Sequence, residues 1–419
     1  MKGPLVDHLF RHQYGKMIAV FTKFFGLSHL EVIEDAVQDT FVKAALQWRN
    51  GPPEHPEAWL MKAAKHRIID LLRKLKAEQH RFAKVTTGAA SLQLNELFLD
   101  HEIEDDQLRM IFVACHPELS VEEQVAFSLK TVSGFSMKEI AAALLTKEET
   151  IKKRLSRARK TIVDQNIQFA FPAPEHVPLR MEGVLRVVYL IFNEGFHSTK
   201  PHQLVDRELC GEALRLAKLL LKKEKLRSGS LYALFALLCF HASRLESKTS
   251  IDYELVDLEE QDRSRWYFPL IKLGHHAMNR ALEFTDTSPY HWEAAIAGEH
   301  LKAPTFADTN WRRVLELYEQ LHARYPADYH LLNRAMVHLQ LDQLTLAKEL
   351  LDAVPDTQLA QRSYLLHGCY ADYYHRQGNE SEALNYLDRA ITLATNELER
   401  QYLTKKRAAW TAVDHDLSH

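Results

Sequence analysis

The sequence predicts an all-helical protein with several domains. The chain has 419 residues, which is too many for one core at roughly 100 to 200 residues per domain. It contains only 14 Gly and 14 Pro, fewer than turn-rich sheets need, while apolar residues make up 46% of it. Apolar positions at helical spacing and repeated capping residues then locate individual helices.

Charge and cysteine usage exclude several classes of protein. Lys and Arg number 53 against 56 Asp and Glu, so any surface for nucleic acid must be local. The cysteines lack the C-x-x-C spacing of zinc sites and show no disulfide framework, which favours a reducing cytoplasm. No signal peptide is recognised, and no apolar run approaches the roughly 20 residues of a membrane-spanning helix. We therefore expect a cytoplasmic protein with no membrane contact.

Residues 4 to 84 are predicted to form three helices. The first carries apolar residues at helical spacing, and the second opens with Ser28 and Glu31, the two halves of a capping box. Glycine and prolines between 51 and 56 end that pattern, and a third helix starts at Glu57.

The third helix has two contrasting faces. Its core face is predicted to consist of Leu60, Ala64, Ile68, Leu71 and Leu75. The other face and its flanks are mostly basic and carry Lys62, His66, Arg67, Asp70, Arg73 and Lys74. Such a surface attracts a polyanion through phosphate contacts and counterion release. For this helix alone, a solvated face without a ligand remains the alternative.

Residues 87 to 116 are predicted to be an acidic linker. Between residues 93 and 118, Arg109 is the one basic side chain among many Asp and Glu. This segment would repel nucleic acid, and it is either a tether in a positively charged channel of a partner or a solvated linker.

Residues 117 to 166 are predicted to form a helix-turn-helix domain. Three capping boxes follow one another, namely Ser120 with Glu123, Ser136 with Glu139, and Thr146 with Glu149. The short gap between the second and third boxes leaves room for about two turns of helix.

The last helix of this domain has the character of a recognition helix. Its predicted core side consists of Ile151, Leu155, Ala158 and Ile162. The residues predicted to face DNA are Thr150, Lys152, Lys153, Arg154, Ser156, Arg157 and Lys160. Basic side chains beside hydroxyls suit the major groove, where Arg and Lys reach guanine edges and phosphates. An ordinary amphipathic surface helix would leave the preceding two-turn helix unexplained.

These segments resemble a known family. "EDAVQDTFVKAALQW" and "PEAWLMKAAKHRIIDLLRK" resemble the polymerase-clamp helix and the minus-10 reading helix of extracytoplasmic-function sigma factors. "LSVEEQVAFSLKTVSGFSMKEIAAALLTKEETIKKRLSRARKTI" resembles their fourth domain, which reads the minus-35 element. The resemblance implies a transcription initiation factor that binds core RNA polymerase and promoter DNA and catalyses nothing. No cofactor, metal or catalytic residue is therefore expected.

The resemblance also implies two groups of contact residues. The clamp helices of the large polymerase subunit would be bound by Asp35, Gln38, Asp39 and Phe41. The basic face of the third helix, with the Asn50 to His55 loop, would meet the minus-10 strand. Many members have Asn where His66 stands, so the resemblance does not carry over a promoter sequence.

Residues 175 to 419 extend the match to a subgroup with a long C-terminal helical extension. The matching segments include "VVYLIFNEGFHS", "EEQDRSRW" and "SPYHWEAAIAGEH". Residues 310 to 400 also resemble degenerate tetratricopeptide repeats. Residues 1 to 86 and 117 to 166 would thus be the second and fourth sigma domains. The extension would regulate them, either by binding a small protein regulator or by an intramolecular contact.

Two clusters in the extension have alternative interpretations. The first cluster consists of Glu194, His197, Asp206 and Glu208. It is either a metal site or, as favoured, a group with a structural or interface role. The second, either a ligand site or, as favoured, a buried salt-bridge knot, consists of Gln261, Asp262, Arg263, Arg265 and Trp266. A rival function follows, namely an enzyme or small-molecule sensor with its pocket between residues 180 and 300. A dimeric repressor that uses only the helix-turn-helix ranks below both.

Overall fold

The computed structural model describes residues 3–48, 51–79, 100–144, 146–198, 203–250, 254–354 and 363–416. The described residues form helices and no strand, with one isolated bridge between Thr249 and Leu255. The predicted all-helical class is therefore confirmed. The chain divides into an N-terminal unit, residues 1–190, and a C-terminal unit, residues 191–419.

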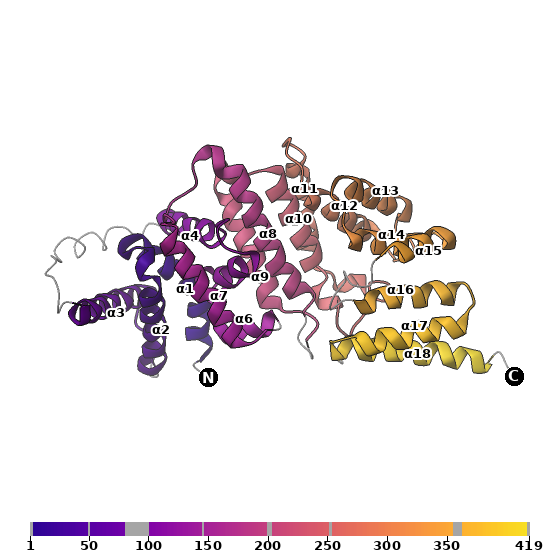
Figure 1. Cartoon of the computed structure of the whole chain (residues 1–419), viewed down its shortest axis with the longest axis horizontal. Coiled ribbons are helices and arrows are strands. Elements are labelled where there is room, and N and C mark those ends of the chain that lie inside the picture. The colour runs from indigo at the N-terminus through magenta and orange to yellow at the C-terminus, as the bar shows by residue number, and fades with distance from the viewer. Residues whose placement is uncertain are drawn as a thin grey trace. The chain divides into compact units, whose positions relative to one another are not determined.

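The N-terminal unit begins with the three predicted helices, α1 (Gly3–Phe25), α2 (Leu30–Gln47) and α3 (Pro56–Gln79) (Figure 1). Their shared core contains fully buried Phe21, Ile33 and Ile68. Trp48 and Trp59 pack across the turn between α2 and α3, with ring centroids 5.3 Å apart. Leu75 was predicted to be in the core and is 40% exposed, so the packed face of α3 ends before its C-terminal turns.

Helix α4 (Asp100–Ala114) corrects the prediction of an acidic linker where the structure describes that segment, and residues 87–99 lie outside the described residues. It packs against α1, and Leu108, Ile111 and Phe112 are buried. Asp106 is also buried, where it bridges to Arg109 and lies 3.5 Å from the Nζ of Lys23. The acidic residues of this segment therefore include a structural ion pair, and its apolar residues form part of the core.

The helix-turn-helix consists of α5 (Val121–Phe127), a π-helical turn η4 (Ser128–Val132), α6 (Met137–Ala143) and α7 (Glu148–Asp164). The capping boxes of Ser120 and Ser136 are both present. The third box is absent, because α7 begins at Glu148 after Lys147, which makes no side-chain cap. Helix α6 spans the two turns that were predicted.

The next four helices are α8 (Val177–Phe196), α9 (Arg207–Lys222), α10 (Gly229–Ala242) and α11 (Phe268–Ala281), followed by α12 (Pro289–Lys302). The division between the two units falls within α8. Helix α10 is the centre of the C-terminal unit here, because α9, α11 and α12 all pack on it. Accordingly, most of its residues are buried on every side.

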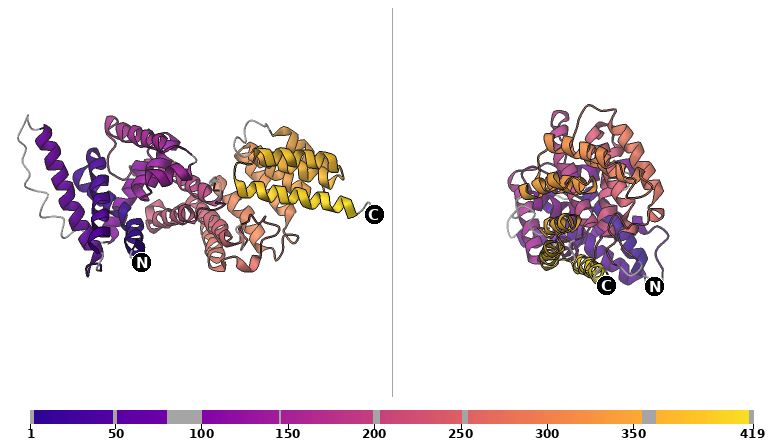
Figure 2. Two further views of the ribbon diagram at one scale, coloured as in Figure 1. Left: turned by 90° about the horizontal axis from the view of Figure 1, so that it is seen from below. Right: turned by 90° about the vertical axis from the view of Figure 1, so that its right-hand side faces the viewer.

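The remaining helices form neighbouring antiparallel pairs (Figure 2). They are α13 (Trp311–Arg324), α14 (Asp328–Gln340), α15 (Leu344–Ala353), α16 (Ser363–Arg376), α17 (Glu380–Leu393) and α18 (Glu397–Asp416). Four small or apolar residues of α16 and α17 within the repeat-like segment are fully buried, namely Ala371, Ala383, Leu387 and Ala390. Gly378, with φ of 77°, follows the end of α16, where a left-handed residue suits glycine. The assignment to tetratricopeptide repeats stays a prediction.

Within the described segments, no helix is both long and apolar enough to span a membrane.

Candidate nucleic-acid interface

Helix α7 presents a basic face to solvent. Ile151, Leu155, Ala158 and Ile162 are buried beneath it, as predicted. The exposed side chains are Lys152, Lys153, Ser156, Arg157 and Lys160, while Thr150 and Arg154 are half-buried. We call these seven residues the recognition face. The short α6 and the turn before α7 leave the N-terminal half of this face open, which is the half that contacts bases in helix-turn-helix proteins.

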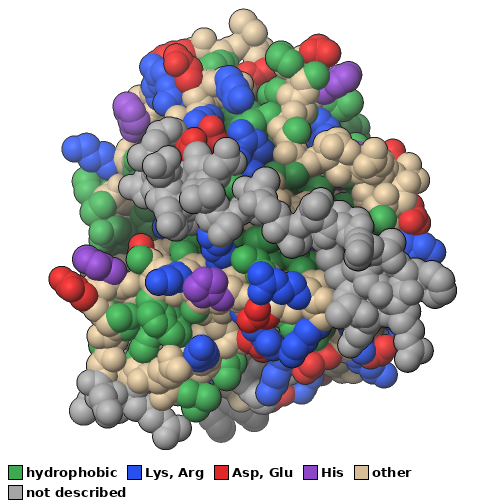
Figure 3. Space-filling view, turned by 90° about the vertical axis from the view of Figure 1, so that its left-hand side faces the viewer, with side chains coloured by type: hydrophobic (Ala, Val, Ile, Leu, Met, Phe, Trp, Pro, Cys, Tyr) green, Lys and Arg blue, Asp and Glu red, His purple; other side chains and the backbone are tan. Residues whose placement is uncertain are grey.

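Helix α3 presents a second basic face. Its exposed members are Lys62, His66, Asp70, Arg73 and Lys74, whereas Arg67 is half-buried. On the side of the molecule where α3 lies, Figure 3 shows Lys and Arg side chains with a histidine among them. Asn50 of the predicted loop lies outside the described residues, while His55 is exposed.

Arg67 and Asp39 were predicted to contact different partners, yet they contact each other. The Nη2 of Arg67 lies 2.6 Å from the Oδ2 of Asp39, and its Nε donates to the same oxygen at 2.9 Å. Both side chains are substantially exposed, so this pair contributes little to stability. It joins α2 to α3 at the boundary between the predicted polymerase and DNA surfaces.

The outward face of α2 differs in part from the prediction. Asp35 and Asp39 are exposed and Gln38 is half-buried, but Phe41 is only 4% exposed. Its ring packs on Phe10, 5.0 Å away, so Phe41 belongs to the core and offers no surface to a partner. The outward positions are instead taken by two exposed apolar residues, Val42 and Leu46. Together with Asp35 and Asp39 they follow helical spacing, the signal that identifies this α2 face in the sequence.

A buried ion pair joins α2 to the recognition helix. Arg159 of α7 donates a hydrogen bond to the carboxylate of Glu34, which is 2% exposed. Burial raises the pKa of Glu34, although Arg159 and Lys130 both favour its charged form. Burial acts to lower the pKa of Arg159, but Glu34 outweighs it and the pKa is raised. No local pattern in the sequence indicated this pair, because its partners are 125 residues apart.

The helix-turn-helix also packs tightly on α1. A Cβ on Gly15 would lie 1.9 Å from the carbonyl oxygen of Val132 in η4, so only glycine fits there. Gly134, with φ of 75°, lies against the ring of Tyr14. The Nζ of Lys130 lies 5.6 Å from the centroid of that ring. These contacts hold the two basic faces in one compact unit.

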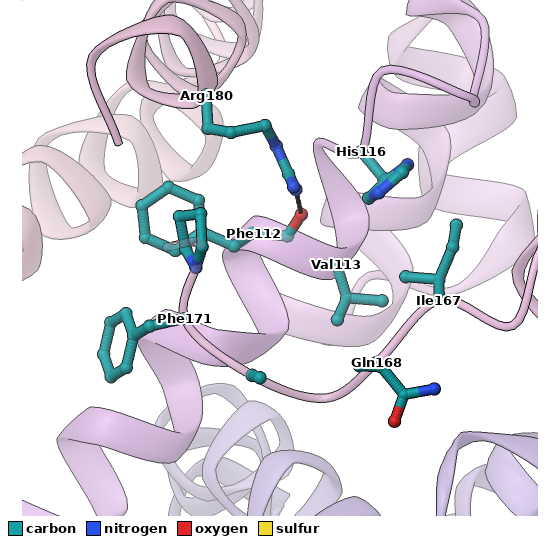
Figure 4. Close-up of a pocket in the computed structure, with 9 residues that line it drawn as sticks. Phe112, Val113, His116, Ile167, Gln168, Phe171 and Arg180 are labelled. Carbon is teal, nitrogen blue, oxygen red and sulfur yellow. Dashed lines mark hydrogen bonds between the residues drawn. The ribbon is translucent and has the colours of Figure 1, made fainter. Parts of the chain in front are cut away.

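A small pocket of about 190 Å³ lies where α4, the segment after α7 and α8 meet (Figure 4). Arg180 of α8 lines it and donates to the carbonyl oxygen of Phe112. The rings of Phe112 and Phe171 lie 6.0 Å apart. Burial, and then the charge of Arg180, lower the pKa of His116. The start of α8 is thereby held against α4.

Two parts of the chain match models of one family. Residues 9–78 match sigma-70 region 2, and residues 109–162 match sigma-70 region 4. The chain belongs to the sigma-70 family. The sigma factor also has a C-terminal match, at residues 180–282, to a family of unknown function (DUF6596). It is 31% identical to an uncharacterized protein of Rhizobium meliloti (strain 1021), with 90% of this chain and 89% of that protein covered. No solved structure matches it.

Region 2 consists of α1 to α3, and the region 4 match begins within α4. Proteins with these regions bind core RNA polymerase and promoter DNA, and the sigma factor acts in transcription initiation. Families of this kind are DNA-binding regulators rather than enzymes.

The first candidate cluster of the extension contains a helix cap. The Asp206 side chain accepts hydrogen bonds from the backbone N–H groups of Glu208 and Leu209 at the start of α9. No group of three or more His, Cys, Asp or Glu with the arrangement of a metal site occurs in the described ranges. The structure thus gives Asp206 a capping role.

The second candidate cluster does not form the predicted salt-bridge knot. Arg265 donates to the carbonyl oxygens of Glu246 and Thr249, and Asp262 caps the short turn at Ser264. In the described part of the chain, none of the five residues is in an ion pair within 4.0 Å. The guanidinium groups are held by backbone carbonyls instead of carboxylates.

Proposed function

We propose that the recognition face of α7 reads the minus-35 element and that the basic face of α3 meets the minus-10 element. Polymerase binding is assigned to the outward face of α2, formed by Asp35, Gln38, Asp39, Val42 and Leu46. The observation that carries this proposal is the presence of two exposed basic helical faces, one in each matched region. Carboxylates beside exposed apolar side chains on α2 suit a protein partner, because such a surface offers both charge pairing and apolar burial.

Promoter opening follows from the same arrangement. A base of the minus-10 strand that leaves the stack costs a few kcal/mol, which contacts with the protein and polymerase must offset. The exposed His66 and Arg73 of α3 offer a hydrogen-bonding group and a cation to the unpaired strand. The polymerase itself supplies the nucleotidyl transfer.

Replacing Arg157 by alanine is expected to weaken promoter binding. Arg157 is exposed on the recognition face, and loss of a base contact costs about 1 to 3 kcal/mol. Binding of the polymerase holoenzyme to promoter fragments, measured by fluorescence anisotropy at several salt concentrations, checks this. If Arg157 contacts a base, the variant should lose sequence preference at one base pair of the promoter. If it contacts a phosphate, affinity should fall equally for all sequences, and affinity should depend less steeply on salt concentration. Arg312→Ala, at an exposed site on α13, is the matched control. Equal binding by Arg157→Ala and the control would remove Arg157 from the interface.

We further propose that the extension regulates the two DNA-reading regions. Support comes from α8, whose Arg180 is hydrogen-bonded to Phe112 of α4, while α4 packs on α1. A change in α8 would therefore reach both regions through one helix.

Arg180→Gln in the full chain is expected to alter transcription from a target promoter while leaving the recognition face intact. Run-off transcription with core polymerase, with binding of the free chain to core polymerase as a second readout, measures this. Removal of residues 175–419 is expected to change output or promoter choice more strongly. If neither variant changes output or promoter choice, and both remain folded by circular dichroism, regulation by the extension is contradicted.

A further inference from the structure

Five side chains from three segments of the extension form a cluster that is rich in donors and poor in acceptors. His241 lies in the last turn of α10, and Arg244 follows that helix. Arg263 and Trp266 belong to the turn before α11, and His300 lies near the end of α12. We call these residues the arginine cluster. All of them belong to the C-terminal unit.

Arg263 is held in place by hydrogen bonds, but one of its nitrogen atoms lacks a hydrogen-bond acceptor. Its Nη1 donates to the carbonyl oxygens of His300 at 2.6 Å and Ala303 at 2.5 Å, which are orphan carbonyls at the end of α12. Its guanidinium stacks on the ring of Trp266, 4.6 Å from the centroid. Its Nη2 is buried and has no hydrogen-bond partner in the described structure. Because guanidinium is only a donor, this group needs an acceptor.

Two further polar atoms of the cluster lack partners. The Nε1 of Trp266 and the Nδ1 of His300 are buried without a hydrogen bond to any part of the chain that is described. Trp266 is more than nine-tenths buried, at 8% exposed. An indole N–H can only donate, so Trp266 also needs an acceptor. Buried polar groups nearly always have a hydrogen-bond partner. Several buried polar atoms without one, gathered around a single arginine, therefore indicate a missing ligand.

The positive charge of the cluster is only partly compensated by carboxylates. Burial, and then Arg263, lower the pKa of Arg244 to about 10, and no carboxylate counteracts them. Burial, and then Arg244 and Arg263, lower the pKa of His300 to about 4. The Nη2 of Arg244 lies 3.2 Å from the Nδ1 of His241. Burial, and then the charge of Arg244, lower the pKa of His241. Burial lowers the pKa of Arg263 as well, although the carboxylate of Asp308 acts in the opposite direction.

We propose that the arginine cluster binds a phosphate group, either as free phosphate or as part of a nucleotide. A phosphate supplies the acceptors that Arg263, Trp266 and His300 lack and the negative charge that two neighbouring arginines need. Arg244 and Arg263 are each half-buried, so part of each residue is in contact with solvent. The cluster lies mostly within the segment that matches the family of unknown function, and the inference is independent of promoter binding.

Titration calorimetry and thermal melting of the full chain, without polymerase, test this proposal. The probes are inorganic phosphate, pyrophosphate and ATP, each at constant ionic strength balanced with sodium chloride. We expect saturable binding of one equivalent of at least one probe, with a rise in melting temperature. ATP binding without phosphate binding would identify a nucleotide as the source, and phosphate binding would identify the free anion. No saturable binding of any probe would overturn the proposal.

Variants distinguish a specific phosphate site from non-specific attraction of anions to positive charge. Trp266→Phe keeps the ring against Arg263 and removes only the N–H donor, and we expect about tenfold weaker binding because one charge-assisted hydrogen bond is lost. Arg244→Gln is expected to abolish binding. Arg312→Gln, at an exposed site on α13, is the matched control and should bind as the unmodified chain does. Equal affinity in Trp266→Phe, Arg244→Gln and the control would overturn the proposal even if the chain binds phosphate.

Discussion

Replacing Arg159 by alanine is expected to lower the free energy of unfolding of the N-terminal unit by about 3 to 5 kcal/mol. The reason is that Glu34 is 2% exposed and would be left as a buried carboxylate without its guanidinium partner. Lys130 also favours the charged form of Glu34, but its effect on the pKa of Glu34 is smaller than that of Arg159. Urea denaturation followed by circular dichroism measures this loss of unfolding free energy for the N-terminal unit.

The pH dependence of this loss has a definite sign. Removing Arg159 raises the pKa of Glu34 further above its ordinary value of 4.5, because Arg159 acts to lower it. A carboxyl whose folded-state pKa is raised contributes stability below its unfolded pKa and loses that contribution as pH rises through the folded pKa. The penalty of Arg159→Ala should therefore shrink as pH falls toward 4.5.

Two controls accompany Arg159→Ala. Lys160→Ala changes the exposed neighbour and should alter stability by less than about 0.5 kcal/mol. Adding Glu34→Gln to Arg159→Ala removes the buried charge and should recover part of the loss. If Arg159→Ala costs no more than Lys160→Ala, the buried pair is not what joins α2 to α7.

Replacing Gly15 by alanine is expected to cost about 3 kcal/mol or more, because the new Cβ would lie 1.9 Å from the carbonyl oxygen of Val132. The clashing atom belongs to the backbone of η4, so no side-chain rotation relieves it. Region 4 would have to move away from α1. Besides lower stability, we expect faster proteolysis between regions 2 and 4.

Gly211→Ala is the matched control for Gly15→Ala. Gly211 lies inside α9, and nothing lies within 4 Å of a Cβ placed there. Alanine is favoured over glycine in a helix, so this variant should be more stable by about 0.5 to 1 kcal/mol. If both substitutions shift stability in the same direction and by the same amount, the close approach of α1 and η4 is contradicted.

Local patterns in the sequence predicted much of the fold. The periodicity of α1 to α3 and the reciprocal capping boxes of Ser120 and Ser136 depend on neighbours within a few residues, so they can be recognised without the fold. The buried side of α7 follows for the same reason. The box at Thr146 failed because the turn before α7 starts that helix later, at Glu148.

Contacts between distant segments could not be predicted. The acidic residues around α4 hid its apolar face, and burial of Asp106 depends on Lys23 in another helix. Phe41 was assigned to the polymerase surface, and only its packing on Phe10 places it in the core. The pairing of Glu34 with Arg159 and the orphan donors around Arg263 likewise depend on tertiary packing.

Run-off transcription by core RNA polymerase on a genomic fragment library, with and without the purified chain, tests the central claim most directly. We predict that the chain co-elutes with core polymerase and that defined start sites appear only in its presence. We also predict that Arg157→Ala weakens initiation at those sites, whereas Arg312→Ala does not. Failure to co-elute, or start sites that are the same without the chain, would contradict promoter selection by the two basic faces.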